Sequence, residues 1–248
     1  MDIPCSMFSS LNAHLAKIFK TRNVLGFCKK IPPFAGGITF ISLLTGSIWG
    51  LLYAPSDYQQ GEIFRIMYVH VPASWWALGI YLLAAGFSIL GLISRIPIFF
   101  FIAKAFAPIG AGFTLISLIT GSIWGKPTWG TWWVWDARLT SMLILLFLYI
   151  GYLNISYRTY NERTLSTASI VLVIGSINIP IIKWSVDWWY TLHQPASLMR
   201  FARPSIHSSM LWPLLIMALG FGTYALTFGC LNLKSLIQER QQQRDNAE

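Results

Sequence analysis

The chain has 248 residues, of which 55% are hydrophobic and only 11% are charged, and its formal net charge at pH 7 is +9. Soluble domains carry about 25% charged residues, so this composition excludes an ordinary water-soluble protein. Because no soluble domain carries the positive charge, the charge does not indicate nucleic-acid binding and is better explained by membrane topology.

Six stretches of the sequence contain no Asp, Glu, Lys or Arg. Each is long enough for the roughly 20 residues that cross a bilayer as an α-helix. The sequence therefore predicts an all-α integral membrane protein with six transmembrane helices. The predicted divisions are a basic N-terminal segment (1–30), a six-helix domain (31–233) and a polar tail (234–248). The charge-free stretches are 31–56, 66–94, 105–125, 139–157, 164–182 and 204–233.

The distribution of Lys and Arg predicts which side of the membrane each loop faces. If the N-terminus is inside, twelve of the 18 basic residues lie on the inner side and six on the outer side. Basic residues are enriched in cytoplasmic loops, so both termini are predicted to be cytoplasmic. The six outer residues are Arg65, Lys126, Arg138, Lys183, Arg200 and Arg203.

In chain order, residues 1–30 are predicted to form a basic lead-in and not a signal peptide, because they lack a sustained apolar core. Helix one is expected from about Pro33 to Tyr53 and helix two from Ile66, with Pro72 loosening helix two by removing a backbone donor. The tail from Lys234 is expected to fray. The remaining helices are expected at 105–124, 139–157, 165–182 and 208–231, with inner connections at 94–104 and 158–163 and outer loops at 54–65, 124–138 and 183–207.

An internal repeat links helix one to helix three. The segments FISLLTGSIWG (40–50) and LISLITGSIWG (115–125) share nine of eleven residues at an offset of 75. The match predicts that the two helices run in the same direction, as in a parallel repeat of helix pairs. The small residues Gly46 and Gly121 would permit close helix packing. The repeat bears on architecture more than on chemistry.

The outer loop 124–138 reads WGKPTWGTWWVWDAR, and Gly125, Pro127 and Gly130 are expected to break any helix there. Tryptophans normally line both membrane faces as an aromatic belt. The predicted topology instead places ten of the twelve at the outer surface and none at the inner one. This one-sided arrangement favours a binding surface. The five tryptophans of the loop are Trp124, Trp129, Trp132, Trp133 and Trp135.

The flat indole rings suit a broad aromatic ligand, and basic residues near them could pair with carboxylates on its edge. Haem offers a large macrocycle and two propionates, and its iron accepts imidazole as an axial ligand. The candidate ligands are His70, about 8 Å below the outer end of helix two, and His193 in the second outer loop. His207 is expected to be an ordinary interfacial residue, and His14 has no predicted role. The candidate carboxylate partners are Lys126, Arg138, Arg200 and Arg203.

Four segments together resemble one family. WGTWWVWDARLTS (129–141) is similar to the tryptophan-rich WWD signature of haem-handling membrane proteins. With YVHVPASWW (68–76), DYQQG (57–61) and DWWYTLHQ (187–194), the chain resembles cytochrome c maturation protein C, the haem exporter protein C family of the bacterial inner membrane. The resemblance implies that the WWD loop is periplasmic. It also implies that haem b binds there transiently, with His70 and His193 as its axial ligands.

The resemblance also implies partners. Haem would pass to a periplasmic haem chaperone that delivers it to apocytochrome c. An ATP-binding subunit, a second membrane subunit and a small one-helix subunit would complete an ABC-transporter-like complex. ATP hydrolysis would belong to the partner, so this chain is expected to bind and transfer haem and not to be an enzyme. The WWD proteins of the haem lyase type are longer and carry additional histidines and helices.

The residues alone also allow two other functions to be considered, a b-type cytochrome and a permease. A b-type cytochrome for electron transfer would usually place both haem ligands inside spans, and His193 in an outer loop speaks against it. A permease for another solute would need polar groups within the spans, which the charge-free stretches largely lack. The absence of CxxC and CxxCH argues against thiol redox chemistry and covalent haem attachment. Asp136 could pair with Arg138 to order the loop or could orient the chaperone.

Overall fold

The computed structural model of the chain describes residues 5–158, 161–189, 191–193 and 206–246. Six of its helical stretches are long and apolar enough to cross a membrane. The prediction of an all-α protein with six spans is therefore confirmed. The six spans are Thr21–Tyr53, Glu62–Ser94, Ile98–Trp129, Ala137–Ser156, Arg163–Trp188 and Ser208–Asp245.

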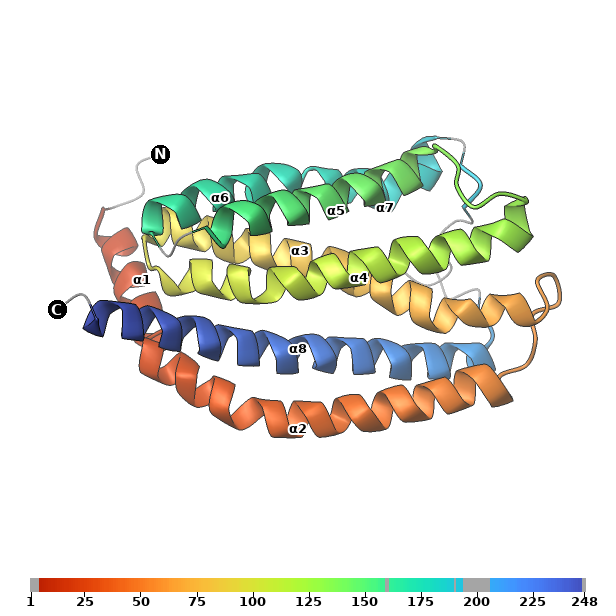
Figure 1. Cartoon of the computed structure of the whole chain (residues 1–248), viewed down its shortest axis with the longest axis horizontal. Coiled ribbons are helices and arrows are strands. Elements are labelled where there is room, and N and C mark those ends of the chain that lie inside the picture. Colours follow the sequence, from red (N-terminus) through yellow and green to blue (C-terminus); the bar gives the residue numbers. More distant parts are fainter. Residues whose placement is uncertain (1–4, 159–160, 190, 194–205, 247–248) are drawn as a thin grey trace.

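The spans stack as three pairs (Figure 1). Helix α2 lies beside α8, α3 lies beside α4, and α5 lies beside α6 and α7. The middle pair contacts both outer pairs, so α3 and α4 form the centre of the molecule. The elements are α1 (Cys5–Ile18), α2 (Thr21–Ile48) with a π-helical end (Trp49–Tyr53), a 3-10 turn (Glu62–Ile66), α3 (Met67–Ser94), α4 (Ile98–Trp129), α5 (Ala137–Ser156), α6 (Glu162–Gly175), α7 (Asn178–Trp188) and α8 (Ser208–Asp245).

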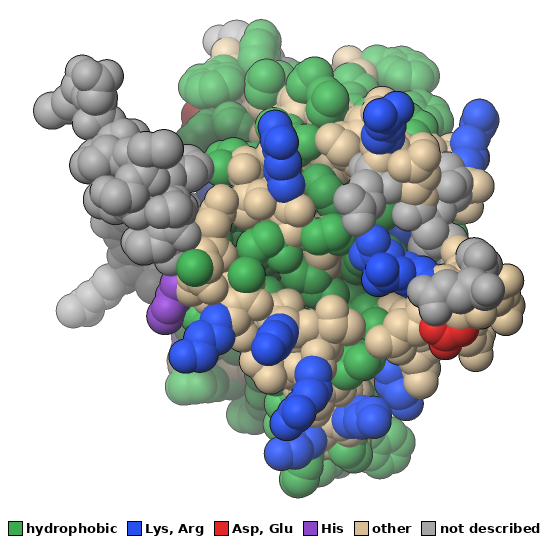
Figure 2. Space-filling model, turned by 90° about the vertical axis from the view of Figure 1, so that its left-hand side faces the viewer, with side chains coloured by type: hydrophobic (Ala, Val, Ile, Leu, Met, Phe, Trp, Pro, Cys, Tyr) green, Lys and Arg blue, Asp and Glu red, His purple; other side chains and the backbone are tan. Residues whose placement is uncertain are grey.

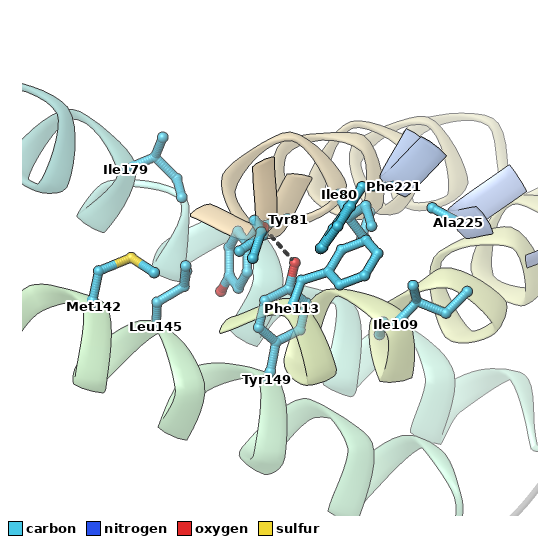
Figure 3. Packing of buried hydrophobic residues seen from close by; sticks show 14 of the residues in the cluster. Ile80, Tyr81, Ile109, Phe113, Met142, Leu145, Tyr149, Ile179, Phe221 and Ala225 are labelled. Carbon is cyan, nitrogen blue, oxygen red and sulfur yellow. Dashed lines mark hydrogen bonds between the residues drawn. The ribbon is translucent and has the colours of Figure 1, made fainter. Parts of the chain in front are cut away.

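Buried tyrosines tie α5 to the central pair (Figure 3). The rings of Tyr81 and Tyr149 are fully buried and meet edge to face, with centroids 4.9 Å apart. The Tyr149 hydroxyl donates to the carbonyl of Ala77 at 2.8 Å, which avoids the cost of an unpaired hydroxyl in an apolar interior. Gly110 makes room for this ring, since a Cβ there would lie 2.2 Å from the hydroxyl oxygen. These contacts hold α3, α4 and α5 closely packed against one another.

The two ends of the molecule differ in composition. Basic side chains gather on the end that carries α1 and the last turns of α8 (Figure 2), as the charge distribution predicts. At the opposite end α2 and α4 both finish, which agrees with the common direction expected from the repeat (Figure 1). We call this second end, formed by residues 54–66, 124–138 and 188–193, the tryptophan-rich end. Which end faces the periplasm stays a prediction from the charge distribution.

At the basic end the helices extend beyond their predicted limits. Helix α2 begins at Thr21 and continues through Pro32 and Pro33, changing direction in its first third (Figure 1). Helix α8 continues to Asp245, so the part of the tail that the structure describes is helical and not frayed. Its extension is held because Leu236 and the residues around it are buried in an apolar cluster.

The predicted inner loop 94–104 is reduced to residues 95–97. Arg95 adopts a left-handed conformation with φ of 57°, and α4 starts at Ile98. The helix starts this early because Phe99 packs against other rings, with the Phe19 centroid at 4.8 Å. Lys104, expected in the loop, is fully buried on α4, and its Nζ lies 4.4 Å from the ring centroid of Tyr157.

The fifth span is two helices where the sequence predicted one. Helix α6 ends at Gly175 and α7 begins at Asn178. Pro180 contributes to this break because it cannot donate to the carbonyl one turn before it. Helix α7 then continues to Trp188 and takes in residues 183–188, which were predicted to belong to the outer loop. By contrast, Pro72 is buried within α3 and does not interrupt it.

Candidate functional site

The last turns of α4 form the base of the tryptophan-rich end. The predicted break at Gly125 and Pro127 is wrong, because α4 continues to Trp129. Pro127 removes only one helical hydrogen bond, and the Thr128 hydroxyl adds a side-chain bond of 2.8 Å to a carbonyl one turn back. A Cβ at position 125 would lie 2.9 Å from the Trp129 ring, so the glycine makes room for that indole. Gly130, with φ of 79°, ends the helix.

His70 lies in the first turn of α3, partly buried against the last turns of α4. Its ring meets Trp124 edge to face, with centroids 5.7 Å apart and an interplanar angle of 83°. Its Nδ1 lies 3.1 Å from Oγ1 of Thr120. The Trp124 Nε1 donates to Oε1 of Gln60 at 2.8 Å. The polar turn at 57–61 thereby fastens the indole that touches His70.

His193 follows α7 and reaches the same end of α4. Its ring lies 4.8 Å from that of Trp129, centroid to centroid, at an angle of 63°. Its Nδ1 is 3.6 Å from Oδ2 of Asp136, too far for a hydrogen bond, and neither atom has a hydrogen-bond partner among the described residues. The other oxygen of Asp136 accepts from the amide of Leu139 at 2.8 Å and caps α5.

The electrostatics of this pair favour a neutral imidazole beside an ionised carboxylate. Burial lowers the pKa of His193, Asp136 opposes that shift, and the guanidinium of Arg138 adds to it, leaving the pKa below its ordinary value. Burial acts to raise the pKa of Asp136, but the contacts with His193 and with the Leu139 amide bring it below its ordinary value. A neutral imidazole with a carboxylate behind it is the form in which histidine commonly binds a metal.

The structure brings the two candidate histidines into one site. They are 123 residues apart in the sequence, yet His70 contacts Trp124 and His193 contacts Trp129, five residues further along the same helix. The end of α4 is therefore the shared support of both rings.

The remaining tryptophans of the loop lie on the connection between α4 and α5. Trp132 and Trp135 are exposed, at 57% and 76% of their surface. Trp133 packs edge to face against Trp135 at 5.5 Å, and its buried Nε1 has no hydrogen-bond partner in the part of the chain that the structure describes. Helix α7 adds the exposed indoles of Trp184 and Trp188 toward the same end, and the residue after it adds that of Trp189. Apolar ring surface thus flanks the two histidines.

Of the basic residues predicted to pair with carboxylates, Arg138 is the one that the structure keeps beside the histidines. It is partly buried in the first turn of α5, and its charge interacts with Asp136 and Asp187. Lys126 is exposed and donates to the carbonyl of Gly130 at 3.0 Å, which closes the end of α4. Arg200 and Arg203 lie outside the described residues.

In the described part of the chain, the other two histidines have no hydrogen bond or ring contact with the residues of the site. His207 caps α8, with its Nδ1 3.3 Å from the amide of Ser209, so it is a satisfied helix-end residue as expected. His14 is exposed on α1, at the opposite end of the molecule (Figure 1).

Three residues that shape the site were not predicted as site residues. Gln60 holds Trp124, and it lies in the DYQQG segment, which was noted only for its resemblance. Thr120 contacts His70, and a Cβ on Gly121 would lie 3.0 Å from the His70 ring. Both belong to the internal repeat, which was interpreted as architectural. The sequence contains the repeat and the DYQQG segment, but it does not reveal that Gln60 contacts Trp124 or that Thr120 and Gly121 contact His70.

Comparison with known proteins identifies the family. A family model described as heme exporter protein C matches residues 14–248. Heme exporter protein C of Haemophilus influenzae is 48% identical over 198 residues, 79% of this chain and 80% of that protein. Heme exporter protein C of Escherichia coli K12 is 43% identical over 219 residues, 88% of each chain. A putative cytochrome c biosynthesis ccmC-like mitochondrial protein of Marchantia polymorpha is 51% identical over 191 residues, 77% of this chain and 80% of that protein. This chain belongs to the heme exporter protein C family.

Proposed function

We propose that this chain binds haem b at its tryptophan-rich end and passes it to a periplasmic haem chaperone during c-type cytochrome biogenesis. The names of its relatives support haem export and cytochrome c biosynthesis. The observation that carries the proposal is the joint placement of His70 and His193 on the end of α4, each against a tryptophan. Haem is here the cargo of the protein, held for transfer.

The residues at this end fit a haem. Two imidazoles supply axial ligands for iron, and the indoles supply apolar faces for the macrocycle. Arg138 supplies a charge for a propionate. The buried Trp133 Nε1 and Thr191 Oγ1 have no hydrogen-bond partner among the residues described, and both can donate to a carboxylate. Because a buried polar group without a partner is costly, a ligand that satisfies these donors would bind more tightly.

The remaining residues of the WWD signature fall into two groups, those that contact the histidines and those that are exposed at the surface. Trp124, Trp129 and Asp136 contact the histidines and hold them in place. Trp132 and Trp135 are exposed at the surface, where the chaperone can meet them. The role requires binding and orientation and no nucleophile or general base from this chain, so we assign it as a binding and transfer subunit and not an enzyme.

We place the protein in the bacterial inner membrane with the tryptophan-rich end in the periplasm. The gathering of Lys and Arg at the opposite end supports this orientation, because basic residues are enriched on the cytoplasmic side (Figure 2). An ATP-binding subunit, a second membrane subunit and a small one-helix subunit would complete the haem delivery complex. The relatives are named heme exporter proteins, and this name agrees with such an assembly.

The test is co-purification of the chain with haem and the chaperone, recorded by visible spectroscopy. His70→Ala and His193→Ala should each lose or alter the bound haem and stop covalent loading of the chaperone. His207→Ala is the control histidine variant, because the Nδ1 of His207 accepts from the Ser209 amide in the first turn of α8, and this variant should retain both. An unchanged bis-histidine spectrum in either site variant would refute the ligand assignment. If an electron donor such as a quinol rapidly reduced the haem and the chaperone were not loaded, a b-type cytochrome would be favoured instead.

A further inference from the structure

Thr120 sits between the His70 ring and the backbone of its own helix. Its Oγ1 lies 2.6 Å from the carbonyl of Ile116, 3.3 Å from that of Ser117 and 3.1 Å from Nδ1 of His70. A hydroxyl has a single proton to donate, and helical threonines commonly give it to the carbonyl one turn back. The short Ile116 contact takes that proton, so the hydroxyl oxygen can accept from the His70 Nδ1–H. The backbone of Ser117, three residues earlier on the same helix, also offers this imidazole a hydrogen bond.

The packing of α3 on α4 sets which edge of the His70 ring faces Thr120. A Cβ on Gly121 would lie 3.0 Å from Cε1 and 3.5 Å from Nδ1 of His70, so the Cε1–Nδ1 edge lies against α4. One turn deeper, the hydroxyls of Ser74 and Ser117 are 2.6 Å apart and link the same two helices. Sliding of α3 along α4 would separate His70 from Thr120, and the hydrogen bond between Ser74 and Ser117 limits this movement.

We propose that Thr120 is a positioning residue that holds His70 in the tautomer with its proton on Nδ1, leaving the lone pair of Nε2 for the iron of haem. The inference rests on the proposed function, in which His70 is an axial ligand. A neutral imidazole carries one proton on one of its two nitrogens, and the hydrogen bond at one nitrogen decides which nitrogen can bind a metal.

The internal repeat supplies a comparison within the same chain. Thr45 and Gly46 occupy the positions of Thr120 and Gly121 in the first copy. There the threonine is exposed, and the glycine packs against Met217, with 2.8 Å from a built Cβ to that side chain. Among the described contacts, the same Thr-Gly pair therefore meets a histidine in the second copy and a methionine in the first. Contact with a histidine is thus a property of the second copy's surroundings and not of the repeated sequence.

The tautomer can be measured without haem. Nitrogen-15 spectra of the full chain, labelled at histidine and reconstituted haem-free in lipid, distinguish a protonated Nδ1 from a protonated Nε2. The His70 signals are identified by their loss in His70→Ala. We expect a protonated Nδ1 in the wild type, a shift toward protonated Nε2 in Thr120→Val, and the wild-type pattern in Thr120→Ser. Thr45→Val is the matched control and should leave the signals unchanged. A protonated Nε2 in the wild type, or an unchanged pattern in Thr120→Val, would overturn the proposal.

The haem-loaded protein gives a second reading. A valine side chain cannot accept a hydrogen bond from the Nδ1–H of His70. The imidazole then donates less electron density to the iron, and the ferric state of the haem is less stabilised. We expect Thr120→Val to shift the haem reduction potential upward and to weaken haem binding about tenfold or more, with both restored in Thr120→Ser. If His70→Ala keeps its haem spectrum, the proposed ligand is wrong while the tautomer result still stands. If His70→Ala loses haem but Thr120→Val keeps the wild-type potential, the role of Thr120 is wrong.

Discussion

Asp136 has two tasks at the tryptophan-rich end. One carboxylate oxygen accepts from the Leu139 amide and caps α5, and the other faces Nδ1 of His193 at 3.6 Å. The sequence suggested pairing with Arg138 or contact with the chaperone. In the structure the close neighbours of the carboxylate are instead the Leu139 amide and the His193 ring, together with the backbone of Arg138. A single residue therefore links the start of a span to a candidate iron ligand.

Substitution can separate these two tasks. Asparagine caps helices as well as aspartate, so Asp136→Asn should leave the unfolding temperature near that of the wild type, whereas Asp136→Ala should lose about 1 kcal/mol of stability. With its amide oxygen on the Leu139 amide, the asparagine presents an N–H₂ donor to His193, which favours the tautomer with the proton on Nε2. We expect haem affinity to fall about 10- to 100-fold in both variants.

Thermal unfolding and haem titration of the purified variants measure the two effects separately. Wild-type haem affinity in Asp136→Asn would show that the carboxylate serves only as a helix cap. A large drop in its unfolding temperature would show instead that the charge of Asp136, and not its capping geometry, stabilises α5.

At the scale of elements, the end of α4 organises the site. It carries Trp124 and Trp129, and it receives a histidine from α3 and another from the segment after α7. The helix can serve both because it continues through Pro127 and stops only at Gly130. Had it ended at Gly125, as the glycine and proline suggest, Trp129 would not stand on the same helix as Trp124.

Gly125 offers a test of this arrangement. A methyl group there would lie 2.9 Å from the Trp129 ring, so Gly125→Ala should push the indole away from His193 and weaken haem binding about tenfold, or by about 1.4 kcal/mol. Gly112→Ala is the matched control on the same helix, because a Cβ there meets nothing within 4 Å. It should keep haem affinity and, as a glycine replaced within a helix, gain up to about 1 kcal/mol of stability. Equal haem affinity in the two variants would contradict a role for the Trp129 position.

At the scale of the whole molecule, three stacked helix pairs separate two chemically different ends. Lys and Arg side chains gather at the basic end (Figure 2). The other end gathers aromatic rings and the two candidate ligands. The buried contacts of Tyr81 and Tyr149 lie between them, so the site rests on packed helices and not on loops alone. This polarity agrees with the proposed presentation of haem on one side of a membrane.

The orientation can be tested with cysteines placed at the two ends in a cysteine-free background. Gln59→Cys lies in the exposed turn of the tryptophan-rich end, and Gln241→Cys lies on the exposed last part of α8. A maleimide that cannot cross the inner membrane should label the first in cells with a permeabilised outer membrane. It should label the second only after the inner membrane is opened. The reverse pattern would place the tryptophan-rich end in the cytoplasm and refute the positive-inside assignment.

The sequence by itself determined the number of spans and the kinds of side chain at the site. Charge-free stretches of about 20 residues are stable as helices in a bilayer, so six of them predict six spans whatever their contacts. Helix limits were harder to predict, because a helix passes Pro32 or Pro127 when packing and side-chain bonds offset the lost donor. The extension of α8 toward Asp245 likewise depends on the apolar cluster that buries Leu236.

Only the tertiary structure decided which residues meet. Thr45 and Thr120 have nearly the same neighbours in the sequence, yet the first is exposed and the second contacts His70. Asp136 and His193 are far apart along the chain and face one another because α5 and α7 pack together. Local sequence sets which bonds a side chain can make. The packing of distant helices sets which partner is close enough to make them, as it brings Thr120 to His70 and Asp136 to His193.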